Sequence, residues 1–349
     1  MADAPEAPCC CGAFVTLVGA EEHVGAALCF KQQMVHVGTR CPLHLAVADH
    51  INGSALSNNS MAALGQAYGE DRIILLSSLL EAAVATGQRA HGRRLFASAL
   101  GKAITTSKIL LWALPPSRFP KVAFIDVDVL VLRNVDSLLQ DSLNESVAAV
   151  PMPIACGYER PYALFNGGVV IFRPSLADAR GLLDTERHVR SPWHGFFPLS
   201  GPSRRSRSNQ SSRWADVCSP ASEPFRYKAL FPGNQSFRDC RLHYNGTLTG
   251  RMTLACERTF TDQSIMNHHF RSRWQPLDRR FNQDARRLSG HAIDCKQMHN
   301  PEKCSASIAH FIGEPKPWKE LQRSRSVRDG ADLRLLWRER CSPFVRDLT

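Results

Sequence analysis

Two carboxylates stand one residue apart inside an apolar run that extends from Phe124 to Leu132. Burying an unpaired carboxylate is costly, so acids in such a run need a cation or hydrogen-bond donors. The run predicts a buried strand, in which successive side chains point to opposite faces, so Asp126 and Asp128 share a face. Hard oxygen ligands at this spacing suit Mg²⁺ or Mn²⁺, which often hold a substrate diphosphate as well. The pair therefore predicts a divalent-metal site, with a chance Asp-x-Asp match as the alternative.

The segments around this run alternate between strand and helix patterns. The pattern predicts a helix over 102–114, ended by Pro115-Pro116 just before the acid-bearing strand. Residues 72–80 fit either a buried strand or a helix. The other expected elements are strands at 13–18, 43–48, 147–150 and 168–172 and a helix at about 24–37. This alternation predicts an α/β fold with a Rossmann-like, mostly parallel sheet, helices on both faces, and ligands at the carboxyl ends of the strands.

Charge points to acidic partners without identifying one. The chain has 349 residues, a formal net charge of +11 and a pI near 9.3, which suits nucleic acid, an anionic membrane or a nucleotide diphosphate. Many arginines lie in Ser-rich stretches without interleaved aromatics, which disfavours nucleic acid as a partner. Between 185 and 258 the apolar periodicity is lost, so this segment is interpreted as a basic Ser/Arg-rich surface insertion.

Two compartments stay open. The first eight residues are acidic and Pro/Ala-rich, unlike a signal peptide, and no run of 18 apolar residues predicts a membrane span, so the default is cytoplasmic. Six sequons and twelve cysteines instead favour a secretory or Golgi lumen. The sequence has no C-x-x-C spacing, so a structural zinc site is not expected. The cysteines expected to pair in an oxidising lumen are Cys218, Cys240, Cys256, Cys295 and Cys304.

Six local motifs occur in an order that resembles glycosyltransferase family 8, which includes glycogenin and galactinol synthase. They are residues 14–17, Ser107-Lys108 before Trp112, residues 124–128, Phe165-Asn166-Gly167-Gly168-Val169, residues 262–267, and residues 310–313 with Lys316-Pro317-Trp318. The resemblance implies a GT-A fold and retaining transfer of a hexose from a UDP-sugar. It also divides the chain into an N-terminal tail (1–12), a nucleotide-sugar and metal part (13–184), the insertion (185–258), an acceptor and catalytic part (259–319), and a C-terminal tail (320–349).

The resemblance further implies a set of site residues. Asp126, Asp128 and His310 would ligate Mn²⁺, with Mg²⁺ as the alternative, and Asp262 and Gln263 would lie beneath the anomeric carbon. The implied substrate-binding residues are Thr16, Leu17, His23, Lys108, Asp126, Val127, Asn166, Gly167, Gly168, Gly313 and Lys316. Several of these residues have a simpler alternative: His310 as a satisfied core residue, Lys108 as an amphipathic edge lysine, Lys316 as an exposed cation beside a proline, Asp262 as a helix cap, and the glycine pair as a bulge.

The chain also departs from the family pattern. His23 stands where many relatives carry a tyrosine that stacks on uracil, and Thr259 stands where glycogenin has an acid. None of the five tyrosines follows Asn267, where glycogenin carries its glucosylated tyrosine, so glycogen priming is disfavoured. A sugar, polyol, glycan, lipid or protein acceptor and the oligomeric state stay open. The alternative function is an inactive family member that binds nucleotide-sugar or glycan.

Overall fold

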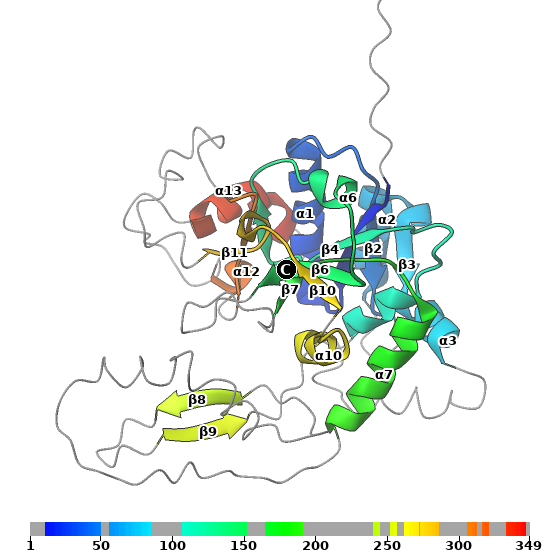
Figure 1. Cartoon of the computed structure of the whole chain (residues 1–349). Coiled ribbons are helices and arrows are strands. Elements are labelled where there is room, and N and C mark those ends of the chain that lie inside the picture. The colour runs from blue at the N-terminus through cyan, green and yellow to red at the C-terminus, as the bar shows by residue number, and fades with distance from the viewer. Residues whose placement is uncertain are drawn as a thin grey trace, which may run out of the picture.

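The structure is a computed structural model that describes residues 11–49, 56–84, 107–151, 165–190, 240–244, 252–256, 262–271, 273–285, 306–312, 316–320 and 333–346. Its centre is a seven-stranded sheet in the order β10-β6-β7-β4-β1-β2-β3 (Figure 1). The strands are β1 (Ala13–Val18), β2 (Leu43–Val47), β3 (Ile73–Leu75), β4 (Val122–Ile125), β6 (Val147–Pro151), β7 (Phe165–Phe172) and β10 (Trp274–Pro276). All pairs are parallel except those that β7 makes with β4 and β6. The mostly parallel sheet expected from the sequence is thereby confirmed.

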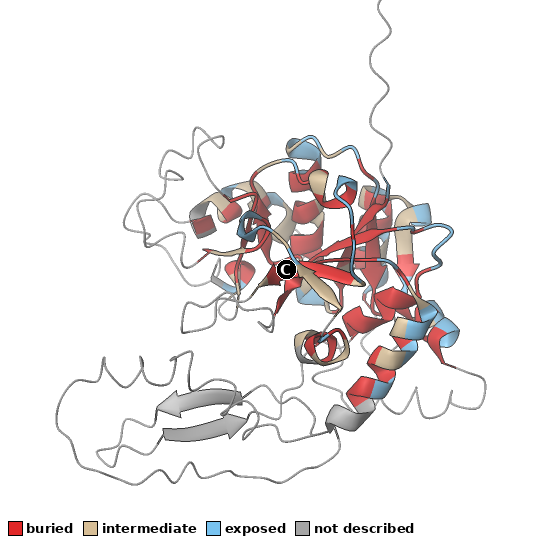
Figure 2. Ribbon diagram, in the orientation of Figure 1, coloured by how far each residue is buried: buried red, intermediate tan, exposed pale blue. Residues whose placement is uncertain are grey.

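Both faces of this sheet are buried, which explains why its strands read as continuous apolar runs. In β1, Phe14 belongs to one core cluster, whereas Ala13 and Val15 belong to the other. Figure 2 shows buried residues along the central strands and on the helix sides that face them. The first cluster includes residues of α1 (Val24–His36), α2 (Asn58–Tyr68), α6 (Ser137–Gln140) and α13 (Leu333–Arg346). The second includes residues of α3 (Leu76–Ala83), the 3₁₀ helix η4 (Ser107–Ala113), α7 (Leu176–Arg190) and α10 (Asp262–His269).

Two smaller sheets complete the described structure. One has the order β11-β12-β5, from Gln283–Asp284, Ile308–His310 and Val129–Val131. The other pairs β8 (Cys240–Tyr244) with β9 (Met252–Cys256), the only described part of the expected insertion beyond α7. The remaining elements are the short helices η1 (Glu21–His23), η2 (Glu70–Arg72), η5 (Arg279–Phe281) and α12 (Pro317–Glu320). No helix in the described segments is long and apolar enough to cross a membrane.

Most expected elements are confirmed, one ambiguous segment is resolved, and one expected helix needs correction. The ambiguous segment 72–80 contains both predicted elements, because β3 runs directly into α3. The helix expected over 102–114 is instead a 3₁₀ helix over Ser107–Ala113, and residues 102–106 lie outside the described residues. All seven of its residues are buried, so it has no exposed face. Lys108 is therefore not an amphipathic edge lysine.

The segment expected to be a C-terminal tail packs into the core. In α13, the Trp337 side chain is fully buried, and a disulfide joins Cys341 to Cys29 of α1. Neither cysteine is among those expected to pair. The cysteines that were expected to pair have no described side chains, although the backbones of Cys240 and Cys256 are opposite each other in the β8–β9 register.

Candidate metal centre and active site

The two central acids lie in a break between strands, which corrects the expected single strand through Leu132. β4 ends at Ile125 and β5 begins at Val129, and the two strands belong to different sheets. On one side, the Asp126 N–H donates to the Gly168 carbonyl over 2.9 Å; on the other, the Phe311 N–H donates to the Asp128 carbonyl over 2.9 Å. Asp126 is thus tied to β7 and Asp128 to the end of β12. Strand alternation does not place these acids together; the change of sheet does.

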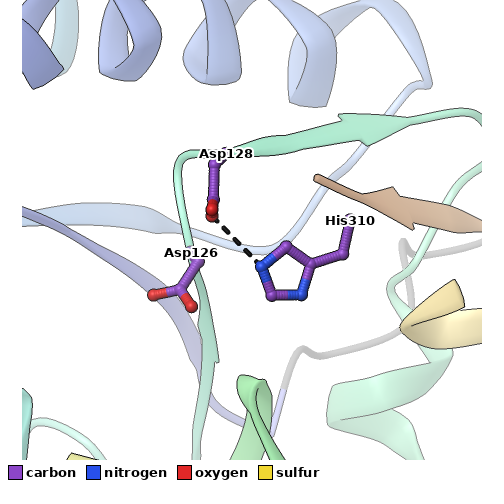
Figure 3. Close-up of side chains that lie close together, drawn as sticks. All are labelled: Asp126, Asp128 and His310. Atoms are coloured by element: carbon purple, nitrogen blue, oxygen red, sulfur yellow. Dashed lines mark ion pairs between the residues drawn. The ribbon is translucent and has the colours of Figure 1, made fainter. Parts of the chain in front are cut away.

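His310 joins the two acids through the smaller sheet. It is the last residue of β12, which is antiparallel to β5, and its register partner is Val129. Asp126, Asp128 and His310 each offer one ligand atom, and these atoms lie within 4.8 Å of one another (Figure 3). His310 Nε2 lies 3.3 Å from Asp128 Oδ1. The side chains of Asp128 and His310 are 9% and 6% exposed, whereas that of Asp126 is 28% exposed, so the cluster opens on the Asp126 side.

The donor set and its surroundings fit a divalent cation. Two carboxylates and one imidazole are a combination that Mn²⁺ accepts. The Lys316 ammonium contacts Asp128 Oδ2, so a positive charge already lies against this carboxylate. Burial alone raises the pKa of Asp128, but His310 and then Lys316 outweigh burial and hold this pKa well below its usual value. Asp128 is therefore kept as the anion that a metal needs.

A buried lysine links the other acid to the start of α10. The Lys108 ammonium lies 2.9 Å from Asp126 Oδ1 and 2.8 Å from Asp262 Oδ2, and it donates to the Gly167 carbonyl over 3.0 Å. Burial tends to lower the pKa of Lys108, but the two carboxylates raise it above its usual value. Burial raises the pKa of Asp126, and Lys108 opposes that effect. All three ammonium protons have an acceptor, so Lys108 holds Asp126 and Asp262 in fixed positions.

The start of β7 makes further contacts with both groups of side chains. The Gly167 N–H donates to Gln263 Oε1 over 3.0 Å, and the Gly168 N–H donates to Asn166 Oδ1 over 2.7 Å. Asn166 Oδ1 also accepts from Asn282 Nδ2 over 2.8 Å. Since this oxygen has two donors within the protein, the Asn166 amide group left to face a ligand is Nδ2. The glycines permit this crowding, because a Cβ at position 168 would lie 2.2 Å from His310 Cε1.

Comparisons with known proteins agree with this arrangement. The model named "Glycosyl transferase family 8" matches residues 251–322, which include Asp262, His310 and Lys316. Glycogenin-1 of Mus musculus is 30% identical over 142 residues, or 41% of this chain and 37% of that protein. Glycogenin-1 of Oryctolagus cuniculus is 32% identical over 111 residues, or 32% of this chain and 28% of that protein. Over these parts of its length, the chain is similar to glycosyltransferase family 8.

Likeness to a solved structure supports the expected fold. The solved structure titled "WbbM bifunctional glycosytransferase apo structure" is similar with a TM-score of 0.50 and 14% identity, over 99% of this chain and 52% of that one. At this identity the likeness concerns the fold alone, which is of the GT-A type expected from the family motifs. The stretches matched to the two glycogenins span only about a third of those proteins, so activity and substrates are treated below as proposals.

The other residues expected from family 8 occupy varied environments. The Thr16 hydroxyl is buried and donates to the Ile125 carbonyl over 2.7 Å, so it links β1 to the end of β4. Leu17 is partly buried and Val127 is 7% exposed. His23 lies edge-on to Trp318, with 5.7 Å between ring centroids. Gly313 lies outside the described residues.

His23 is close enough to the metal centre for the Asp128 and Lys316 charges to act on it. Burial lowers its pKa, and the negative charges of Glu22 and Asp128 partly oppose this effect. Burial therefore favours the neutral form of the ring.

One residue in contact with the site was missed from the sequence. Asn282 lies between η5 and β11, is 7% exposed, and reaches His310 Nδ1 with its Oδ1 over 2.8 Å. Its sequence context, Arg-Phe-Asn-Gln, carries no metal or catalytic pattern. Its proximity to His310 results from the parallel pairing of β11 with β12.

Proposed function

We propose that this protein is a divalent-metal-dependent glycosyltransferase that transfers a hexose from a UDP-sugar to an acceptor with retention of configuration. The observation that carries the proposal is the cluster of Asp126, Asp128 and His310, set beside the Lys108–Asp262 pair. The match to the family 8 model supports the reaction class, and the exposed side of Asp126 supports entry of a charged donor. Residues 13–184 and 259–319 would together form the catalytic unit, with 185–258 as an insertion.

Asp126, Asp128 and His310 would hold the metal, which when bound offsets the charge on the departing nucleoside diphosphate. A carboxylate and imidazole set favours Mn²⁺ over Mg²⁺. The Lys316 ammonium, which contacts Asp128 here, would pair with the diphosphate instead when metal and donor are bound. The Asp128 carboxylate would then be neutralised by the metal in place of Lys316. Lys108 would keep Asp126 oriented throughout, since its ammonium has no spare proton to donate.

A retaining enzyme needs a nucleophile or an electrostatic partner near the anomeric carbon, where positive charge develops in the transition state. Asp262 would supply that group. It is the first residue of α10 and is 8% exposed, and Lys108 fixes its carboxylate. Gln263 would lie next to it, with Oε1 held by the Gly167 N–H. These contacts orient both side chains before a substrate binds, which is the preorganisation that such stabilisation depends on.

The test is release of UDP from a panel of UDP-hexoses with Mn²⁺ or with EDTA. We expect Mn²⁺-dependent release from the native protein and none from Asp128→Asn. Asp136→Asn is a matched control, because Asp136 is also 7% exposed but accepts from the Arg40 backbone N–H and the Asn134 side-chain amide instead. It should retain activity. Binding of UDP with Mn²⁺ but no release with any acceptor offered would favour the inactive, binding-only alternative, and neither binding nor release would refute the proposal.

A further inference from the structure

A chain of buried hydrogen bonds runs from a backbone amide to the imidazole of the metal centre. The Gly168 N–H donates to Asn166 Oδ1, which also accepts from Asn282 Nδ2. Asn282 Oδ1 lies 2.8 Å from His310 Nδ1. The far nitrogen of that ring, Nε2, is the one that lies near Asp128. Each link joins side chains that are less than a tenth exposed.

The donor and acceptor of every hydrogen bond in this series follow from the first bond, in which the Gly168 N–H donates. A backbone N–H can only donate, so the atom of Asn166 that faces Gly168 must be the oxygen. That oxygen can only accept, so Asn282 must face it with its NH₂ group. Asn282 then presents its oxygen to His310, and the ring nitrogen facing it must carry a proton. In the neutral ring the proton is therefore on Nδ1, and Nε2 has the free lone pair.

We propose that Asn282 is the positioning residue that sets the His310 tautomer and aims Nε2 at the divalent cation. A ligating histidine whose other nitrogen donates to a fixed acceptor has a defined orientation and is a stronger ligand. The inference rests on the metal site proposed above and adds a residue to which neither the family motifs nor the comparisons assign a role. Asn282 does not touch the metal; it acts only through His310.

Steric contact acts on the same ring. A Cβ on Gly168 would lie 2.2 Å from His310 Cε1 and 2.5 Å from Nδ1, so the ring packs directly over this glycine. The contact limits the tilt of the ring but is indifferent to which nitrogen has the proton. Of these two contacts with the Nδ1 side of the ring, the hydrogen bond to Asn282 is the one that distinguishes the two tautomers, so replacing Asn282 separates proton placement from packing.

The experiment measures the Kd of Mn²⁺ directly, by the loss of the free-ion electron paramagnetic resonance signal, in the full chain without donor sugar. In Asn282→Leu the side chain keeps its approximate size but offers no acceptor. We expect this variant to bind Mn²⁺ about 10- to 100-fold more weakly, the range found for lost outer-shell partners. Asn282→Asp still accepts from Nδ1 and should bind within a few fold of the native protein, although it places a carboxylate next to Asn166 Oδ1 and should lower stability.

A positioning role predicts that Asn282→Asp loses stability but keeps its affinity for Mn²⁺. A merely structural role predicts that metal affinity falls whenever stability falls. Asn267→Leu is the matched control: Asn267 is 8% exposed and bonds Phe165 and Gln263 but not His310. It should lower stability and leave Mn²⁺ affinity unchanged. The inference is overturned if Asn282→Leu and Asn282→Asp lose affinity equally, or if Asn282→Leu stays within about twofold of native.

The metal site itself is tested in the same titration. Native protein that binds Mn²⁺, with binding lost in Asp128→Asn, establishes the site and confines any failure to the role of Asn282. Absence of Mn²⁺ binding to the native protein would overturn both the site and the inference.

Discussion

Replacing Lys108 by Met tests whether one buried ammonium holds the two halves of the candidate site together. Met keeps the length and apolar stem of the side chain but leaves Asp126 and Asp262 without their shared cation. Removing one partner of a buried ion pair typically costs about 3 to 5 kcal/mol. Because the Asp126 side chain is 28% exposed and can recover some hydration, we expect the lower end, about 3 kcal/mol. The measurement is urea unfolding at pH 7 without metal.

The loss should depend on pH in a defined direction. Burial already raises the pKa of Asp126, and removing Lys108 removes the principal charge that opposes this rise. Between the unfolded and folded pKa values, the folded variant binds more protons than the unfolded chain, so its stability falls as pH rises. The deficit relative to native protein should therefore be smaller at pH 5 than at pH 7.

Lys121→Met is the control for loss of a buried lysine as such. Lys121 is 7% exposed, against 6% for Lys108, but its ammonium donates to the carbonyls of Leu139 and Asp141 rather than to carboxylate groups. It should give a loss that hardly changes between pH 5 and pH 7. Adding Asp262→Asn to Lys108→Met should restore part of the stability. A Lys108→Met loss below about 1 kcal/mol, or one independent of pH, would refute the reasoning.

Three further predictions concern the framework around the site. Cys341→Ser should lower the free energy of unfolding by about 2 to 5 kcal/mol, and a reductant should then lower the melting temperature of native protein but not of the variant. Burial lowers the pKa of His44 from 6.5 to about 4, so stability should fall by up to about 3 kcal/mol as pH decreases between these values; urea unfolding of His44→Gln should show a flatter dependence. In Gly181→Ala, the new methyl would lie 2.3 Å from Cε1 of His269, and calorimetry should show a loss of about 1 to 3 kcal/mol.

Local sequence patterns were sufficient for the elements of the main sheet. β1, α1 and β2 match their predicted ranges closely because their apolar residues face cores on both sides of the sheet. The pattern was insufficient where one apolar run serves two sheets. Val122 to Val131 is almost uniformly apolar, yet β4 pairs with β7 while β5 pairs with β12 from far along the chain. Only that distant pairing shows that the chain breaks at the acids.

The 3₁₀ helix η4 shows a second case in which apolar periodicity was insufficient to predict the structure. A lysine at the edge of an apolar segment normally predicts a half-exposed helix whose lysine extends into water. Here the ammonium of Lys108 is held by Asp126, Asp262 and the Gly167 carbonyl, which come from three other segments. Those acceptors offset the cost of burial, so the whole helix can lie in the core. Periodicity cannot reveal acceptors that are supplied from elsewhere in the fold.

The candidate ligands of a metal centre are easier to predict from a sequence than the residues that orient them. Asp126 and Asp128 stand out by their spacing in an apolar run, because few other side chains can bind a divalent ion, and His310 was expected from the family motif. Any acceptor of suitable size could orient His310, and Asn282 can do so only because β11 pairs with β12 and because Gly168 fixes the direction of the Asn166 amide. Its role depends on the order of donors and acceptors in a series of hydrogen bonds that exists only in the folded protein. A residue of this kind is therefore identified by tracing the hydrogen bonds outward from the ligands.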